Sequence, residues 1–349
     1  MNINQLLQLT IQRNASDLHL VPGYPPLLRL NGELVPVSGP ELVTDEVITA
    51  FTITILNPLQ KKIFDENLEV DLSFTFAGRS RFRVNVFKEQ GHIAVALRHI
   101  PELIPELTGL GLPPVIQKLS ELKQGLILIT GPTGHGKTTT LAALLNKINL
   151  TRSCHIITIE DPVEYVYPKG KALINQREMF SDTKSWNGAL RAVLREDPDV
   201  VLVGEMRDFE TISAAVTVAE TGHLVFATLH TNSASQSVDR IIDAFPTHQQ
   251  SQIRTQLSSA LEAIISQRLV PTINPGRALA VEVLIKTPAL STLIRDGKSH
   301  LIDNLIQTSG ELGMVSLDTS LAKLISDGKI SKEMGLTFSL HPDFLARLI

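Results

Sequence analysis

Hydrophobic and polar residues alternate in two different ways along the chain. In the first hundred residues the apolar runs are short, and residues 79–86 alternate strictly between polar and apolar side chains. A period of two predicts a strand with one buried and one polar face. The buried set is Phe82, Val84 and Val86, and the polar set is Arg79, Arg81 and Arg83.

Other segments of this region also indicate a small sheet domain. Residues 27–30 are mostly apolar and run into Asn31-Gly32, a pair that favours a two-residue hairpin turn. A helical pattern covers about residues 44–66, and a strand-like run follows at residues 70–74. The chain therefore begins with a compact domain that contains both strands and helices.

From about residue 113 onward the pattern changes to apolar runs that alternate with helical segments. Runs of this kind are typical of buried parallel strands, and their alternation with helices predicts an α/β sheet. The predicted strands are residues 125–130, 155–160, 200–204 and 224–229, and the predicted helices are residues 138–149, 185–195, 210–221, 248–269 and 316–326.

Prolines and glycines between the two regions predict a linker. Pro101, Pro105, Pro113 and Pro114, with Gly109 and Gly111, disfavour regular structure there. The expected organisation is an N-terminal domain over residues 1–98, a linker over 99–112 and a second domain over 113–349.

Composition narrows the class of protein. The 349 residues are 43% hydrophobic and 19% charged, which is ordinary for a folded globular chain. One cysteine, Cys154, excludes an intramolecular disulfide and favours a reducing, cytoplasmic location. We expect no signal peptide and no transmembrane helix, since no apolar run approaches ~20 residues. A net charge of −4 gives no overall basic field, so no nucleic-acid partner is expected.

The strongest chemical signal is a glycine-rich loop directly after the predicted strand at residues 125–130. It fits the phosphate-binding pattern G-x-x-x-x-G-K-[ST], and a predicted helix follows it. Glycines let backbone N–H groups turn toward phosphate oxygens, and the helix N-terminus adds partial positive charge. A tight turn that served only the backbone would not require the Lys-Thr pair. The expected nucleotide-binding residues are Gly131, Pro132, Thr133, Gly134, His135, Gly136, Lys137, Thr138 and Thr139.

Three residues of this loop have distinct expected roles. Lys137 is expected to reach the β- and γ-phosphates of ATP, and the Thr138 hydroxyl to bind Mg²⁺. His135 is expected to contribute its backbone N–H, and a catalytic role for its imidazole is not expected.

Acidic residues end two other predicted strands. Glu205 follows residues 200–204, at the carboxyl end where α/β sheets bind ligands, and is a candidate Walker-B acid. Glu160, Asp161 and Glu164 follow the strand at residues 155–160. A solvated turn would also explain three carboxylates within five residues, but their place at a strand end beside the phosphate loop favours a function.

Ordered motifs over nearly the whole chain resemble the type II/IV secretion-system ATPases. After the P-loop, the segments that resemble the Asp box, Walker B with its flanks and the His box are residues 158–164, 194–199, 204–208 and 221–232, and smaller matches occur at residues 16–20, 25–26, 31–32, 81–85 and 316–318. The resemblance implies an α/β fold: a RecA-like P-loop ATPase domain preceded by a smaller α+β PAS-like domain.

The resemblance also implies roles for acids and histidines. Glu205 would organise Mg²⁺ and its water, and Glu164 would be the general base, with Glu160 and Asp161 as alternatives. His223 and His230 resemble the His-box residues that sense the γ-phosphate, and two histidines that flank one predicted strand favour that role over a purely structural one.

Arginines are implied to act between subunits. Arg81 and Arg83 resemble residues that complete a neighbour's site in trans, where a guanidinium neutralises charge in the transition state. A solvated basic strand face is the alternative interpretation.

Within the family, the chain resembles the retraction ATPases of type IV pili. Assembly and type II secretion ATPases typically carry an additional N-terminal domain and a four-cysteine zinc element, and neither is expected with 349 residues and one cysteine. Residues 289–296 match the retraction signature Ala-Ile-Arg-Asn-Leu-Ile-Arg-Glu in part, with Ser291-Thr292 in place of Arg-Asn.

This resemblance implies partners and a location. A ring, expected to be a homo-hexamer, would hydrolyse ATP with Mg²⁺ and act on the inner-membrane pilus platform protein, and so indirectly on pilin, as a peripheral protein at the pilus base. The alternatives are an assembly or secretion motor, a nucleotide-binding regulatory subunit without significant hydrolysis, and a DNA-translocating relative.

Overall fold

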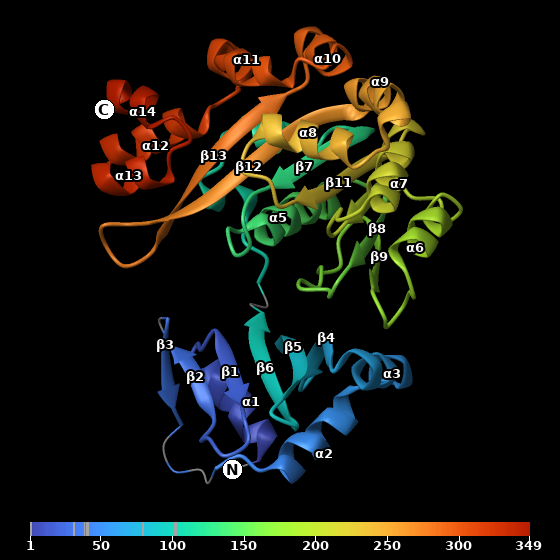
Figure 1. Ribbon diagram of the computed structural model, residues 1–349, viewed down its shortest axis with the longest axis vertical. Helices are drawn as coiled ribbons and strands as arrows, with labels where there is room; N and C mark the ends of the chain where they lie inside the picture. The colour runs from blue at the N-terminus through green and yellow to red at the C-terminus, as the bar shows by residue number, and fades with distance from the viewer. Residues whose placement is uncertain (1, 31, 38, 40–41, 79, 101–102) are drawn as a thin grey trace. The chain divides into compact units, whose positions relative to one another are not determined.

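The computed structural model describes residues 2–30, 32–37, 39, 42–78, 80–100 and 103–349, which form two compact units (Figure 1). The first unit is Met1–Ile104 together with Glu160–Val166 and Gln176–Ser185. The second is Pro105–Ile159, Tyr167–Asn175 and Trp186–Ile349. Two short segments from the middle of the chain thus belong to the N-terminal unit.

The first unit is an antiparallel sheet with helices packed on its apolar face. The strand order is β3-β2-β1-β6-β5-β4, and its core includes Leu18, Phe82 and Leu97, which are fully buried. The strands are β1 (Asp17–Leu20), β2 (Leu27–Leu30), β3 (Glu33–Pro36), β4 (Glu69–Phe76), β5 (Ser80–Glu89) and β6 (His92–Ile100), and the helices are α1 (Ile3–Gln12), α2 (Asp45–Ile55) and α3 (Pro58–Asn67).

The period-two prediction is confirmed in β5, where Phe82, Val84 and Val86 are buried while Arg81 and Arg83 remain partly exposed. The hairpin of β2 and β3 is also confirmed, with Leu30 opposite Glu33. Three residues invoked in these predictions, Asn31, Arg79 and the linker's Pro101, lie outside the described residues.

The helix expected over residues 44–66 is two helices, α2 and α3. Asn57 caps α3 by accepting a hydrogen bond from the backbone N–H of Gln60, and Pro58 is its first residue. A proline at the first helical position starts a helix and cannot continue the preceding one. The local sequence therefore breaks the segment at this point.

The second unit is built on a seven-stranded sheet in the order β13-β12-β7-β11-β10-β8-β9. Strands β7, β8, β10, β11 and β12 run parallel where they pair, and β12 and β13 form an antiparallel hairpin at one side. The bounds are β7 (Gly125–Thr130), β8 (His155–Glu160), β9 (Leu173–Glu178), β10 (Val200–Val203), β11 (Leu224–Leu229), β12 (Leu261–Pro271) and β13 (Arg277–Ile285). The four predicted apolar strands are confirmed.

Helices cover this sheet and follow it at the C-terminal end (Figure 1). The helix predicted over residues 248–269 is wrong beyond residue 260, because β12 takes over at Leu261 and pairs with both β7 and β13. The bounds are α4 (Val115–Leu119), α5 (Lys137–Thr151), α6 (Trp186–Val193), α7 (Phe209–Glu220), α8 (Ala234–Asp243), α9 (Gln250–Ala260), α10 (Pro288–Arg295), α11 (Ile302–Thr308), α12 (Leu317–Ser326), α13 (Lys332–Phe338) and α14 (Pro342–Leu348).

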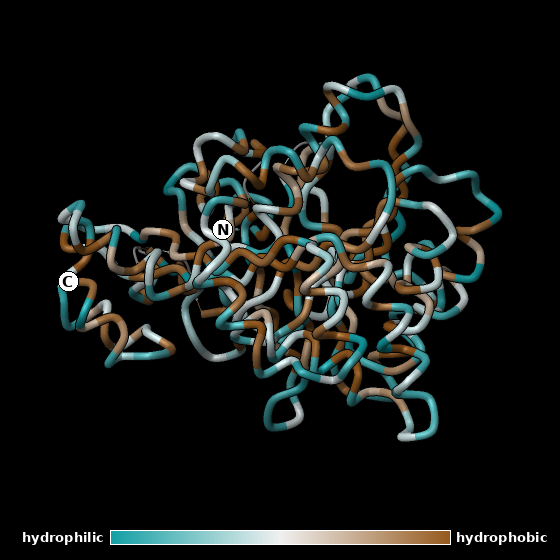
Figure 2. The backbone as a smooth tube through the Cα atoms, turned by 90° about the horizontal axis from the view of Figure 1, so that it is seen from above, coloured by the Kyte–Doolittle hydropathy of each residue, from teal (hydrophilic) through white to brown (hydrophobic). Residues whose placement is uncertain are grey.

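Hydrophobic and hydrophilic stretches alternate along the chain (Figure 2). Among the described residues, no helix is both long and apolar enough to cross a membrane.

Candidate functional site

The P-loop connects the carboxyl end of β7 to the first turn of α5. Gly131, Gly134 and Gly136 have φ values of 137°, 79° and 86°, in the region that favours glycine. Gly136 occupies the N-cap position of α5, and no side chain caps the helix there. The N–H groups in the first turn of an α-helix have no acceptor within the helix itself, so those of this 15-residue helix are suited to phosphate oxygens.

Lys137 lies across this loop. Its side chain is buried, with 8% of the residue exposed, and its Nζ donates hydrogen bonds to the carbonyl oxygens of Gly131 at 2.7 Å and Pro132 at 2.9 Å. A lysine ammonium has three N–H donors. These two bonds hold the ammonium against the loop for which phosphate binding is predicted.

Strand β12 supports the loop from one side. The Thr130 and Ser266 hydroxyls are 2.8 Å apart, and the Gln267 Nε2 donates to the Thr140 hydroxyl in α5 at 2.9 Å. A Cβ on Gly131 would lie 2.3 Å from the carbonyl oxygen of Gln267, so only glycine fits at this position. Through these contacts β12 packs against the end of β7, the first residue of the loop and α5.

Glu205 and His230 meet beside the P-loop. Glu205 follows β10 and His230 follows β11, so both lie at the same carboxyl edge of the sheet as Thr133. His230 Nε2 is 3.2 Å from Glu205 Oε1, and His230 Nδ1 is 3.3 Å from the Thr133 hydroxyl. The imidazole thus bridges Glu205, the candidate Walker-B acid, and the glycine-rich loop.

Glu205 is held as a carboxylate. Burial favours its protonated form, but the hydrogen bond and charge of Arg207, with His230 and Lys137, outweigh burial and lower the pKa of Glu205. Arg207 Nη2 lies 2.8 Å from Glu205 Oε2. An ionised carboxylate and the Thr138 hydroxyl are hard oxygen donors of the kind that Mg²⁺ prefers, so these residues fit that ion.

The two predicted histidines do not meet. His223 precedes β11, and its Nδ1 lies 3.0 Å from the carbonyl oxygen of Val218 and 3.1 Å from the Thr221 hydroxyl. His230 follows the same six-residue strand, so the two histidines are about 20 Å apart at ~3.3 Å per residue. Of these two histidines, His230 is the one that contacts the P-loop of its own chain.

The Asp-box acids belong to the first unit with Arg81 and Arg83. Glu164 Oε1 lies 3.8 Å from Arg83 Nη1, and Glu160, which is 7% exposed, accepts a hydrogen bond from Gln176. The P-loop, Glu205 and His230 belong to the second unit. The predicted site residues therefore fall into two groups, one in each unit.

A buried glutamate, Glu178, contacts Arg81 of the first group, and the sequence analysis did not predict it. Its carboxylate lies 3.5 Å from Arg81 Nη2 and accepts hydrogen bonds from the Ser73 hydroxyl and the Val163 N–H. Arg81 also donates to the Val163 carbonyl oxygen at 3.2 Å. Since Glu178 is 105 residues from Ser73 in the chain, only the arrangement of the strands reveals it.

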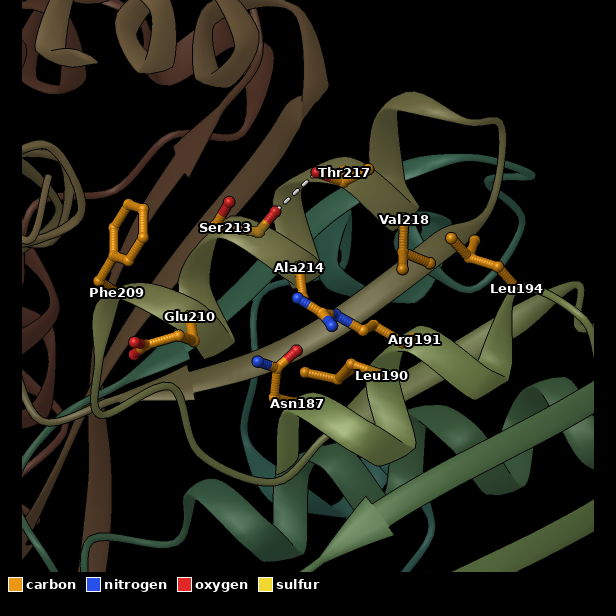
Figure 3. Close-up of a pocket in the computed structure, with 10 residues that line it drawn as sticks. All are labelled: Asn187, Leu190, Arg191, Leu194, Phe209, Glu210, Ser213, Ala214, Thr217 and Val218. Atoms are coloured by element: carbon orange, nitrogen blue, oxygen red, sulfur yellow. Dashed lines mark hydrogen bonds between the residues drawn. The ribbon is translucent and has the colours of Figure 1, made fainter. Parts of the chain in front are cut away.

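A separate groove of about 270 Å³ lies between α6 and α7 (Figure 3). Its lining is mixed: apolar side chains such as Leu190 and Val218 lie beside the charged Arg191 and Glu210. None of its lining residues is a predicted site residue.

Known proteins share both the sequence and the fold of this chain. It is 46% identical to the type IV pilus retraction ATPase PilT of Pseudomonas aeruginosa, over 95% of this chain and 96% of that protein. It is 47% identical to a twitching motility protein of Neisseria gonorrhoeae, over 88% of this chain and 82% of that one. A crystal structure of the pilus retraction motor PilT with bound ADP matches with a TM-score of 0.91 at 45% identity, covering 99% of both chains.

Secretion ATPases are more distant. Identity to the type II secretion system protein E of Aeromonas hydrophila is 35%, over 78% of this chain and 54% of that protein. The chain is a close homologue of pilus retraction ATPases, and its fold is a RecA-like ATPase domain with an N-terminal antiparallel sheet domain. Because the profile of the family described as type II/IV secretion system protein also matches residues 1–310, the chain belongs to that family.

Proposed function

We propose that the protein is an ATP-hydrolysing ring motor that powers retraction of type IV pili. The observation that carries the proposal is the set of contacts at the edge of the second unit's sheet, where His230 joins Glu205 to the P-loop residue Thr133. Through this bridge, a phosphate bound in the loop would act on Glu205, which is expected to organise Mg²⁺ and its water. The close homology to retraction ATPases supports this assignment.

Residues of the second unit would bind the nucleotide. The backbone N–H groups of residues 131–139 and the Lys137 ammonium would hold the β- and γ-phosphates of ATP. Thr138 and Glu205 would hold Mg²⁺, partly through water, and the ion would neutralise phosphate charge. His230 would sense the γ-phosphate through the Thr133 hydroxyl.

Residues of the first unit would complete the reaction. Glu164 is proposed as the general base that takes a proton from the attacking water. Arg81 and Arg83 are proposed to act on a neighbouring subunit, where a guanidinium would neutralise charge in the transition state. His223 lies away from the P-loop of its own chain, so a sensing role for it would also require a neighbour.

The wider assignment follows from homology. The proposed assembly is a homo-hexamer in which the two predicted domains, over residues 1–98 and 113–349 with a linker at 99–112, move relative to one another as nucleotide is hydrolysed. The proposed site of action is the inner-membrane pilus platform, at the cytoplasmic side, with pilin as the indirect substrate.

An assembly or secretion motor of the same family is the second candidate. The specific observation in its favour is the departure at α10, where Ser291 and Thr292 replace the Arg-Asn of the retraction signature. Ser291 instead donates a hydrogen bond to the Ser258 carbonyl oxygen in α9. The higher identity to retraction ATPases, 46% against 35%, favours retraction.

Two variants test the enzymatic assignment. Lys137→Ala should abolish nucleotide-phosphate contact, and Glu205→Gln should retain ATP without releasing phosphate. The measurements are binding of a fluorescent ATP analogue and Mg²⁺-dependent phosphate release, with the exposed His300→Leu as control. Turnover equal to wild type in either variant would refute the site, and ATP binding without phosphate release by the wild type would indicate a regulatory subunit.

A deletion strain tests the direction of the motor. Loss of a retraction ATPase should increase the number of surface pili, whereas loss of an assembly motor should remove them. Restoration of the normal number by the wild-type gene, but not by Glu205→Gln, would tie the effect to hydrolysis.

A further inference from the structure

The P-loop histidine has a partner that the loop pattern does not predict. His135 Nδ1 accepts a hydrogen bond from the backbone N–H of Leu269 at 2.9 Å. The expectation was that His135 contributes only its own backbone N–H. Its side chain instead joins the middle of the loop to strand β12, 134 residues further along the chain.

The position of this bond follows from where β7 ends. Strands β7 and β12 pair in parallel up to Thr130 and Ser266, after which β7 turns into the P-loop. Beyond that point β12 continues to Pro271 and pairs with β13 on its other side. The Leu269 N–H faces the loop, where no strand remains to accept it, and a half-buried donor left without an acceptor is costly. His135 supplies the acceptor.

The bond requires an imidazole that is unprotonated at Nδ1. Burial lowers the pKa of His135, and the positive charges of Lys137, Arg268 and Arg277 lower it further. The ring is therefore neutral near neutral pH, with its proton on Nε2, which leaves Nδ1 free to accept.

We propose that the His135 side chain is a positioning residue that fixes the P-loop against β12 in its phosphate-binding shape. Together with the hydrogen bonds of Ser266 and Gln267, it is a third tie to β12, and it holds the loop between Gly134 and Gly136. Glycines on both sides leave the loop backbone free to take other conformations, so a tether between them reduces the conformational entropy lost on binding phosphate. The proposal rests on the proposed nucleotide-binding function of the loop.

Four variants separate the tether from simple packing. His135→Leu and His135→Ala remove the acceptor, with and without filling the space, whereas His135→Asn keeps a carbonyl acceptor at the same number of bonds from Cβ as Nδ1. His300→Leu is the matched control, because His300 is an exposed histidine in the same unit. A purely packing role would be preserved by Leu and not by Asn.

Hydrogen exchange at the Leu269 amide tests its hydrogen bond to His135 in the absence of nucleotide. In the Leu and Ala variants the Leu269 amide should exchange about tenfold faster than in wild type, with near wild-type protection in the Asn variant. Unchanged protection in both Leu and Ala variants would overturn the tether. The exchange rates test the tether whether or not the protein binds nucleotide. A failure to bind nucleotide would refute the proposed function and leave the tether intact.

Binding of a fluorescent ADP analogue tests whether loss of this hydrogen bond weakens nucleotide binding. The dissociation constant should rise about tenfold in the Leu and Ala variants and recover in the Asn variant, while kcat at saturating ATP changes less than KM. Faster amide exchange with an unchanged dissociation constant would overturn the positioning role. Equal losses in the Asn and Leu variants would do the same, because the acceptor would then be irrelevant.

Discussion

The buried carboxyl of Glu282 should make the stability of the second unit depend on pH. Glu282 lies in β13 with 4% of the residue exposed, and its Oε1 accepts a hydrogen bond from the Ala234 N–H at 2.7 Å. The Leu317 backbone N–H is a second donor to it. Ala234 and Leu317 are the first residues of α8 and α12, so one side chain serves two helix N-termini.

The local charges set the direction of the effect. Burial raises the pKa of Glu282 from 4.5 to about 7, and the negative charges of Asp303 and Asp318 add to the rise, whereas the two backbone donors oppose it. Arg268 is the positive group in this neighbourhood. Between pH 4.5 and about pH 7, Glu282 therefore carries a proton in the folded protein, whereas in the unfolded chain it has lost that proton.

The magnitude follows from proton linkage. A group whose pKa is higher in the folded state stabilises fully below its unfolded pKa and loses that stabilisation as the pH rises through the folded pKa. At about 1.4 kcal/mol for each pH unit, the interval from 4.5 to about 7 corresponds to about 3 kcal/mol. Wild type should therefore lose about 3 kcal/mol relative to Glu282→Gln between acid and mildly alkaline pH.

The single tryptophan provides the assay. Trp186 belongs to the second unit, so its fluorescence during urea unfolding reports that unit. Wild type, Glu282→Gln and the exposed control Glu311→Gln are compared from about pH 5 to about pH 8. The Gln variant loses one acceptor, which shifts its stability equally at all pH values, so the test is the pH-dependent part. A constant difference from wild type across this range would refute the reasoning.

Three further substitutions test other contacts. Gly131→Ala should lower both stability and nucleotide affinity, because the added Cβ would lie 2.3 Å from a β12 carbonyl oxygen; unchanged binding of a fluorescent ADP analogue would contradict this. Asp208→Ala should destabilise α7 by about 1 kcal/mol, since Asp208 caps it through the Thr211 N–H. Hydrogen bonds from Thr211 lower the pKa of Asp208, so wild type should lose this advantage as the pH falls through that pKa, which the same fluorescence assay would detect. Arg207→Gln should release one Glu205 oxygen and lower the Mg²⁺ concentration for half-maximal phosphate release; an unchanged midpoint would exclude competition between Arg207 and the ion.

Local sequence was sufficient where a segment carries its own signal. The alternation in β5 and the apolar runs of β7, β8, β10 and β11 appear in the structure as predicted, because burial of one strand face or of both faces imposes those patterns. The P-loop is equally local, since its glycines and the start of α5 lie within nine residues. The sequence also placed Glu205 and His230 at strand ends.

Local sequence failed where pairing decides the conformation. Residues 261–269 fit the end of a helix as well as a strand, and they become β12 because β7 and β13 offer backbone partners on both sides. The position of His223 likewise depends on strand direction, which sends the two ends of β11 to opposite edges of the sheet.

The sequence by itself determined the family, the two kinds of domain and the glycine-rich loop before α5, because these depend on residues close together in the chain. Only the tertiary structure decided that Glu178 gathers Arg81 and Val163, that His230 bridges Glu205 to Thr133, and that His135 reaches Leu269. Each of these is a hydrogen bond or ion pair between strands or loops remote in sequence. Such pairs form because a sheet brings the ends of different strands together at one edge. A local pattern of hydrophobic and polar residues does not show which strands become neighbours.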